Sequence, residues 1–136
     1  MKKIRIIICD NDEDELYYAN EGFKKSGLFE VIQVVESGDD LIELLETMNK
    51  KDFPDLILSD LNMPGKNGYD LLALLGNDPQ FADIPIYISS TAFSQLTMDK
   101  CSRLGAKDYI VKPDNFSRYD IFAISLYDKI MIEYPR

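Results

Sequence analysis

Short apolar runs alternate with helix-like segments along the whole chain, and this alternation restricts the fold more than any other feature. Five runs are predicted to be strands, over residues 4–9, 30–35, 56–58, 84–89 and 108–111. The first run is nearly all apolar, as expected of a strand covered on both faces. Alternating strands and helices of these lengths form right-handed crossovers around a parallel sheet. The sequence therefore predicts an α/β fold with five parallel strands and helices on both faces.

Apolar residues at helical spacing mark five segments between and after these strands. The predicted helices cover residues 13–26, about 41–48, 68–76, 93–104 and 116–133. Gly27 and Gly105 stand where a left-handed residue can end the first and the fourth of them. The apolar residues that mark the fourth helix are Phe93, Leu96, Cys101 and Leu104.

The last predicted helix has more apolar residues than one buried face requires. Two apolar stripes run along it, the first with Phe122, Leu126 and Ile130 and the second with Ile124, Tyr127 and Met131. The first stripe is predicted to face the core. Two explanations of the second stay open: a partner covers it, or neighbouring elements bury it.

Polar side chains directly follow four of the predicted strands. They are Asp10, Asn11 and Asp12 after the first strand, Asp60 and Asn62 after the third, Ser90 and Thr91 after the fourth, and Lys112 after the fifth. Because ligands of such sheets bind outside the carboxyl ends of the strands, we expect these side chains to share one site. Carboxylate and carbonyl oxygens suit Mg²⁺, which uses one or two protein carboxylates together with water and phosphate oxygens. The set favours phosphoryl transfer to Asp60, with a metal, a lysine and a hydroxyl to balance the charge.

The stretch from Phe53 to Gly68, FPDLILSDLNMPGKNG, places Asp60 at the end of an apolar run, followed by two residues, Met63-Pro64 and a nearby glycine. It resembles the phosphoacceptor strand and loop of response-regulator receiver domains, and the other receiver elements follow in matching order over essentially the whole chain. The resemblance implies a flavodoxin-like, doubly wound (βα)5 fold with strand order 2-1-3-4-5.

The resemblance assigns a phosphorylation and metal site to four residues. Asp60 would accept the phosphoryl group, Asp10 would help to hold Mg²⁺, and Asn62 would offer its backbone carbonyl to the metal. The chain departs from the family at Asn11, where receivers usually have a second acid that binds the metal directly. An amide oxygen can coordinate Mg²⁺ but adds no charge, so a weaker metal affinity is expected.

The resemblance also identifies residues that respond to phosphorylation. Ser90 falls at the switch hydroxyl that closes onto the phosphoryl group, and Tyr109 at the aromatic residue that turns inward with it. Lys112, which is followed by Pro113, falls at the position of the lysine that is typical of receivers. In receivers the bond between that lysine and the proline is usually cis, so the same is expected here. Ala92, two residues past Ser90, cannot hold a hydrolytic water. We therefore expect slow autodephosphorylation. By resemblance to receivers, we also expect self-phosphorylation from a donor, and no other enzymatic activity.

Length and composition narrow the function further. The 136 residues fit one receiver domain, residues 1–136, with no output domain. Histidine is absent, which excludes histidine-dependent catalysis, and Cys9 and Cys101 are expected to be reduced core thiols. A net charge of −9 disfavours binding to nucleic acid or to anionic lipid. No apolar run is long enough to cross a membrane, so we expect a cytoplasmic protein.

The expected partners are proteins. By resemblance to receivers, a sensor histidine kinase or a phosphotransfer protein supplies the phosphoryl group, and an unknown downstream protein reads the signal. Tyr17 and Tyr18, on the first helix, are candidates for the kinase-docking surface. The second stripe of the last helix is a candidate for a homodimer contact.

Two alternatives stay open. Asn11 leaves room for a pseudo-receiver that binds proteins without being phosphorylated. A haloacid-dehalogenase-type phosphatase also begins with an apolar strand and an Asp-x-Asp, which Asp10 and Asp12 match. However, the acidic pair that such enzymes have after a later strand is missing, and their scheme does not explain Asp60 with its Met-Pro-Gly loop. A phosphorylated receiver is therefore the favoured interpretation.

Overall fold

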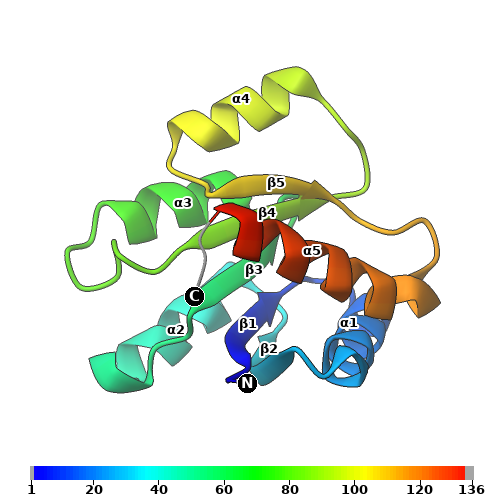
Figure 1. Cartoon of the computed structure of the whole chain (residues 1–136). Helices are drawn as coiled ribbons and strands as arrows, with labels where there is room; N and C mark the ends of the chain where they lie inside the picture. Colours follow the sequence, from blue (N-terminus) through cyan, green and yellow to red (C-terminus); the bar gives the residue numbers. More distant parts are fainter. Residues whose placement is uncertain (1, 134–136) are drawn as a thin grey trace.

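A computed structural model describes residues 2–133, and its centre is a parallel sheet of five strands (Figure 1). The strands are β1 (Ile4–Cys9), β2 (Phe29–Val35), β3 (Leu56–Asp60), β4 (Ile86–Ser90) and β5 (Asp108–Val111). Their order is β2-β1-β3-β4-β5, and every neighbouring pair is parallel. The predicted fold class and strand order are confirmed.

Five α-helices cover the two faces of the sheet (Figure 1). They are α1 (Glu13–Ser26), α2 (Gly38–Thr47), α3 (Gly68–Gly76), α4 (Gln95–Arg103) and α5 (Tyr119–Glu133), with short 3₁₀ turns η1 (Lys50–Asp52) and η2 (Phe116–Arg118). Helices α1 and α5 pack together on one face, and α2, α3 and α4 pack on the other. No helix within residues 2–133 has the length and apolar character needed to span a bilayer.

Side chains of each strand alternate between these two faces. Ile4, Ile6 and Ile8 of β1 point into the core under α1 and α5, whereas Ile7 and Cys9 point into the core under α2, α3 and α4. This alternation decides on which side of the sheet each residue at a strand end is placed.

Local signals explain where several elements begin and end. The Asp12 side chain accepts a hydrogen bond from the backbone N–H of Glu15 and starts α1, and Gly27 ends it with φ of 75°. Strand β4 begins at Ile86 rather than at the predicted residue 84, because Pro85 has no N–H to donate to a strand ladder. The last helix begins at Tyr119, after the 3₁₀ turn η2, rather than at residue 116.

The predicted face of α4 is wrong in part. Ser94 caps this helix by accepting from the backbone N–H of Thr97, so Phe93 lies before its first turn. Phe93 is 61% exposed and Leu96 is 82% exposed. Cys101 is fully buried and Leu104 packs partly against the same core, which shows that only the second half of the predicted stripe faces inward.

The two stripes of α5 have different environments. Phe122, Leu126 and Ile130 are buried, as predicted. In the second stripe, Tyr127 is half-buried against the Phe29 ring, with the ring centroids 6.2 Å apart, whereas Ile124 stays 44% exposed. Neighbouring elements therefore bury part of the second stripe and leave part of it in contact with solvent.

The close approach of α1 to α5 depends on Gly22. A Cβ atom at this position would lie 2.5 Å from Cβ of Tyr119 and 2.7 Å from the backbone nitrogen of Asp120. Such distances are far below van der Waals contact, and backbone atoms cannot move aside cheaply. The glycine therefore lets the first turn of α5 rest directly on α1.

We expect Gly22→Ala to lower the free energy of unfolding by about 1–3 kcal/mol, because α5 must move away from α1. Gly76→Ala is the matched control, since nothing lies within 4 Å of its Cβ position at the end of α3. The control should leave stability unchanged or raise it by up to about 1 kcal/mol. Urea denaturation of both variants tests this, and equal stabilities would contradict the close packing.

Candidate functional site

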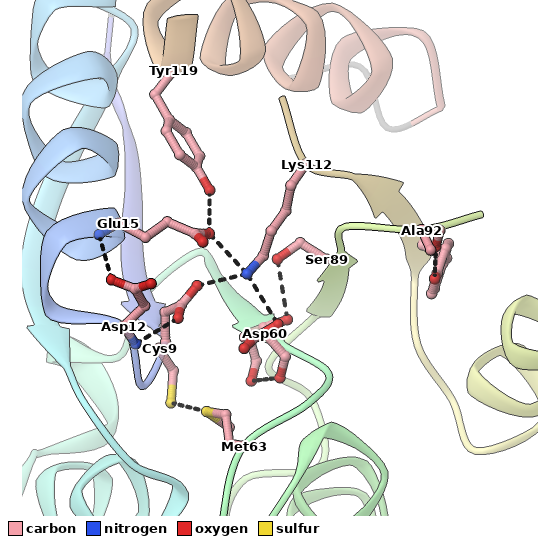
Figure 2. A network of polar contacts seen from close by, with 12 residues as sticks. Cys9, Asp12, Glu15, Asp60, Met63, Ser89, Ala92, Lys112 and Tyr119 are labelled. Carbon is pink, nitrogen blue, oxygen red and sulfur yellow. Dashed lines mark hydrogen bonds and ion pairs between the residues drawn. The ribbon is translucent and has the colours of Figure 1, made fainter. Parts of the chain in front are cut away.

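A buried lysine at the carboxyl end of the sheet contacts three carboxylates (Figure 2). Lys112 Nζ lies 2.8 Å from Asp10 Oδ2, 2.8 Å from Glu15 Oε2 and 3.0 Å from Asp60 Oδ1. None of the four side chains is more than 9% exposed. The structure thus brings together Asp10, Asp60 and Lys112, as the sequence analysis expected, and adds Glu15.

Strand alternation explains why these side chains meet. Asp60 continues the row of Leu56 and Leu58, which pack under α1 and α5, and Asp10 follows Ile8 in the same way. Lys112 comes just after β5 and reaches across β4 to the same face. The acids of β1 and β3 and the lysine after β5 therefore share the face on which α1 lies.

Sequence reasoning missed Glu15 and Tyr119. Glu15 lies in the first turn of α1 and is only 4% exposed, and its Oε2 accepts a 2.6 Å hydrogen bond from the Tyr119 hydroxyl (Figure 2). Glu15 is four residues before the buried Ala19, so it occupies the apolar face of α1. An acid on that face was a usable signal. Nothing in the sequence paired it with Tyr119, which is 104 residues away.

Burial and crowding set the charges of the site. Burial alone would lower the pKa of Lys112, but its contacts with Asp10 and Glu15 and the charges of Asp10 and Asp60 outweigh burial and raise that pKa. Burial, and then repulsion by Asp10, raises the pKa of Asp60 in spite of the nearby Lys112. Burial also raises the pKa of Glu15. One firmly charged ammonium thus lies beside two carboxyl groups, Asp60 and Glu15, that burial makes costly to ionise.

The residues expected to bind a metal lie around Asp10 and Asp60. Asn11 and Asn62 are exposed, and the backbone N–H of Asn62 hydrogen-bonds the Asp60 carboxylate. Among residues 2–133, no group of three or more His, Cys, Asp or Glu side chains is arranged to hold a metal ion. The two buried carboxylates, beside the exposed Asn11 and Asn62, still fit Mg²⁺, which needs only one or two of them together with water and phosphate oxygens.

The expected switch residues lie near the carboxyl end of the sheet, on the side of α4. Ser90 ends β4 and is 4% exposed. Tyr109 is also buried, and its hydroxyl donates to the Ala92 carbonyl at 2.5 Å. Tyr109 is therefore already turned inward, with its hydroxyl held by the loop that follows β4.

The expectation of a cis bond before Pro113 is wrong for this structure, because residues 2–133 contain no cis peptide bond. The trans form of a bond before proline is favoured by about 0.5–1 kcal/mol. Lys112 reaches all three carboxylates from this trans backbone.

The two cysteines are buried thiols, as expected. Cys9 Sγ lies beneath the site, 3.8 Å from Met63 Sδ (Figure 2). Burial raises the pKa of Cys9 to about 12, so this thiol stays protonated and unreactive at neutral pH.

Comparison with known proteins gives a family match and close relatives. The family model of the response regulator receiver domain matches residues 6–121. Protein PilH of Pseudomonas aeruginosa is 30% identical over 109 residues, which are 80% of this chain and 85% of PilH. Chemotaxis protein CheV3 of Helicobacter pylori is 35% identical over 92 residues, and the match spans 63% of this chain but only 29% of CheV3.

A solved structure shows the same fold. The phosphorylated cyanobacterial phytochrome response regulator RcpA superposes with a TM-score of 0.80 and covers 99% of this chain and 97% of its own. Its sequence identity is 24%, so this likeness concerns the arrangement of strands and helices alone.

Removing the charge of Asp60 should stabilise the fold. Because folding raises the pKa of this carboxyl above its ordinary 3.8, ionisation destabilises the folded state as pH rises through the Asp60 titration. We expect Asp60→Asn to raise the free energy of unfolding at pH 7 by on the order of 1 kcal/mol. The gain should shrink as pH falls through the raised pKa of the folded state, and it should vanish below the ordinary value of 3.8, where the carboxyl is protonated in both states.

Urea denaturation at several pH values measures this effect. Asp83→Asn is the matched control, because Asp83 is exposed, and its stability should change by less than about 0.5 kcal/mol. A loss of stability in Asp60→Asn at pH 7 would show that pairing with Lys112 outweighs burial.

Proposed function

Because the chain belongs to the family of response regulator receiver domains, which act in two-component signalling, we propose that it signals by accepting a phosphoryl group on Asp60. The observation that supports this most directly is the contact between Asp60 and Lys112, 3.0 Å apart at the buried end of β3. A carboxylate nucleophile beside a fixed ammonium is the minimum that acyl phosphate formation requires.

The proposed reaction is a phosphoryl transfer. One carboxylate oxygen of Asp60 attacks the phosphorus of a phosphohistidine or of a small acyl phosphate, and the bond between phosphorus and the leaving group breaks. Lys112 offers its ammonium to the negative charge that gathers on the phosphoryl oxygens. The Asp60 carboxylate is itself within hydrogen-bond reach of Lys112, so the ammonium needs little movement to meet the new group.

Asp10 and Asp60 are the residues that would hold Mg²⁺, with Asn11 and the backbone carbonyl of Asn62 at the same edge. Bound there, Mg²⁺ would offset charge on the phosphoryl oxygens. Asn11 has no charge to contribute, so the metal affinity of this chain is weaker than in a receiver with an acid at that position.

The proposed switch involves Ser90 and Tyr109. The buried Ser90 hydroxyl would donate to a phosphoryl oxygen, and its movement would draw the loop that holds Tyr109 through the Ala92 carbonyl. Phosphorylation then shifts an existing equilibrium toward a state with a different partner surface. The methyl group of Ala92 cannot hold an attacking water by a hydrogen bond, and we infer that the acyl phosphate is long-lived.

We infer a receiver that works in the cytoplasm through protein contacts. A sensor histidine kinase or a phosphotransfer protein would supply the phosphoryl group, and Tyr17 and Tyr18, both exposed on α1, would contribute to that docking. Exposed Ile121 and Ile124 of α5 support a homodimer contact or a downstream partner on that helix. No role in binding nucleic acid or membrane is proposed.

Asn11 keeps one other candidate function open, a pseudo-receiver that binds proteins without phosphorylation. The family assignment speaks against the phosphatase alternative, which needs Asp10 rather than Asp60 as the nucleophile. Phosphorylation itself separates the two remaining functions.

Incubation with acetyl phosphate and Mg²⁺ should add one phosphoryl group to the wild-type chain, and none to Asp60→Asn or to a sample with chelator. Lys112→Met should slow the reaction by about a hundredfold, because one preorganised donor is lost. Intact-mass spectrometry measures both the reaction and the slow decay of the product. If the folded wild-type chain gains no phosphoryl group from acetyl phosphate or from any histidine kinase, the pseudo-receiver is the better description.

Replacing the unusual amide should strengthen metal binding. We expect Asn11→Asp to raise Mg²⁺ affinity on the order of tenfold, since it adds a charged ligand to a hard-cation site. Asn49→Asp makes the same charge change at the opposite edge of the sheet, where Asn49 precedes η1, and should leave the affinity nearly unchanged. Isothermal titration calorimetry compares the variants. Equal affinities in wild type and Asn11→Asp would remove Asn11 from the metal site.

A further inference from the structure

The ammonium of Lys112 has three N–H donors, and three carboxylates surround it. Asp10 and Asp60 are expected neighbours of this lysine, but Glu15 comes from α1 and has no role in the function proposed above. Its Oε2 lies 2.8 Å from Lys112 Nζ, as close as the Asp10 oxygen and closer than the Asp60 oxygen. Three donors of one ammonium thus face three carboxylate oxygens.

Glu15 is itself held in place from two sides. Its backbone N–H is capped by Asp12 Oδ1 at 3.1 Å, which fixes the first turn of α1. The Tyr119 hydroxyl donates at 2.6 Å to the same Oε2 that accepts from Lys112. Glu15 Oε2 therefore contacts both the Lys112 ammonium and the Tyr119 hydroxyl (Figure 2). Its position is set by two helices, α1 through Glu15 and α5 through Tyr119.

Tyr119 is a rigid support for this oxygen. It is 3% exposed, its ring packs against Phe122 with centroids 5.2 Å apart, and its Cβ lies where Gly22 leaves room for it. The packed ring consequently holds the Tyr119 hydroxyl next to the Glu15 carboxylate. The position of the oxygen does not depend on a flexible surface group.

We propose that Glu15 is a positioning residue for phosphoryl transfer: held by Tyr119, it accepts one N–H of the Lys112 ammonium, so that another N–H points at Asp60. With Asp10 and Glu15 occupied, the third donor has only Asp60 to reach, and a phosphoryl oxygen can take the place of the Asp60 oxygen without disturbing the other two contacts. Without Glu15, a buried donor loses its acceptor and the ammonium turns between the remaining carboxylates. This role rests on the proposed function, because the reaction it serves is phosphorylation of Asp60.

Two substitutions separate positioning from charge. Glu15→Gln keeps an oxygen acceptor for Lys112 and Tyr119 but removes the charge, whereas Glu15→Met has a similar length and no comparable acceptor. We expect Glu15→Met to slow phosphorylation by acetyl phosphate by about tenfold, and Glu15→Gln to restore most of the rate. Tyr119→Phe, which keeps the ring and removes the donor, should fall between them.

A purely structural role needs its own control. Ile130→Ala removes a buried side chain from α5 at the far end of that helix from Tyr119, and should lower stability without changing the rate per folded molecule. Folded fractions come from urea denaturation of every variant. A rate for Glu15→Met equal to that of the wild type, or a loss in Glu15→Gln as large as in Glu15→Met, would overturn the proposal.

A second readout does not depend on phosphorylation. The protons of a buried ammonium held by three acceptors exchange slowly with water, so its ¹⁵N NMR signal stays sharp. The Lys112 Nζ signal should therefore be observed in the wild type and in Glu15→Gln but broadened in Glu15→Met. Lys112→Met assigns the signal. If the wild type accepts no phosphoryl group while this pattern holds, the proposed function fails and the placement of Lys112 by Glu15 stands. If the signal is unchanged in Glu15→Met, Glu15 does not position the ammonium.

Discussion

The contact of one buried ammonium with three carboxylates is the interaction on which the rest of this structure depends. Lys112 comes from the chain after β5, Asp10 from the end of β1, Asp60 from the end of β3 and Glu15 from α1. None of these groups is stable alone in a buried position, since each would lose its hydration without gaining a partner. The four side chains therefore hold two strand ends, a loop and a helix at one point, close to where the strand order reverses.

The cluster contains more acidic than basic groups. Three acids face one base, and burial and mutual repulsion raise the pKa values of Glu15 and Asp60. A site of this kind gains from a cation and from a group that disperses negative charge, which is the physical basis for the metal-assisted phosphoryl transfer proposed at Asp60. The excess of carboxylates that is expected to lower stability is thus the same feature that would make the site reactive.

The two faces of the sheet divide the proposed work. Asp10, Asp60 and Lys112 lie on the side of α1 and α5, where Glu15 and Tyr119 support them. Tyr109 belongs to the opposite core, packed with Cys101 of α4, and its hydroxyl holds the loop after β4. Under the proposed function, phosphorylation of Asp60 would act outward in two directions, one through Ser90 and the loop near α4 and one through Glu15 and Tyr119 to α5.

The sequence by itself determined the fold class and the placement of Asp10, Asp60 and Lys112 at one edge, because strand periodicity and the rules of parallel sheets depend only on local residue patterns. The strand order followed from the resemblance of its motifs to those of receiver domains. The sequence also indicated the buried stripe of α5 with Phe122, Leu126 and Ile130. Only the tertiary structure decided that Glu15 faces Lys112, that Tyr119 supports Glu15, and that Phe93 and Leu96 stay exposed. These outcomes depend on how α1, α4 and α5 rotate and approach the sheet. That approach is set by contacts between residues far apart in the chain, such as Gly22 with Tyr119, which no local pattern records.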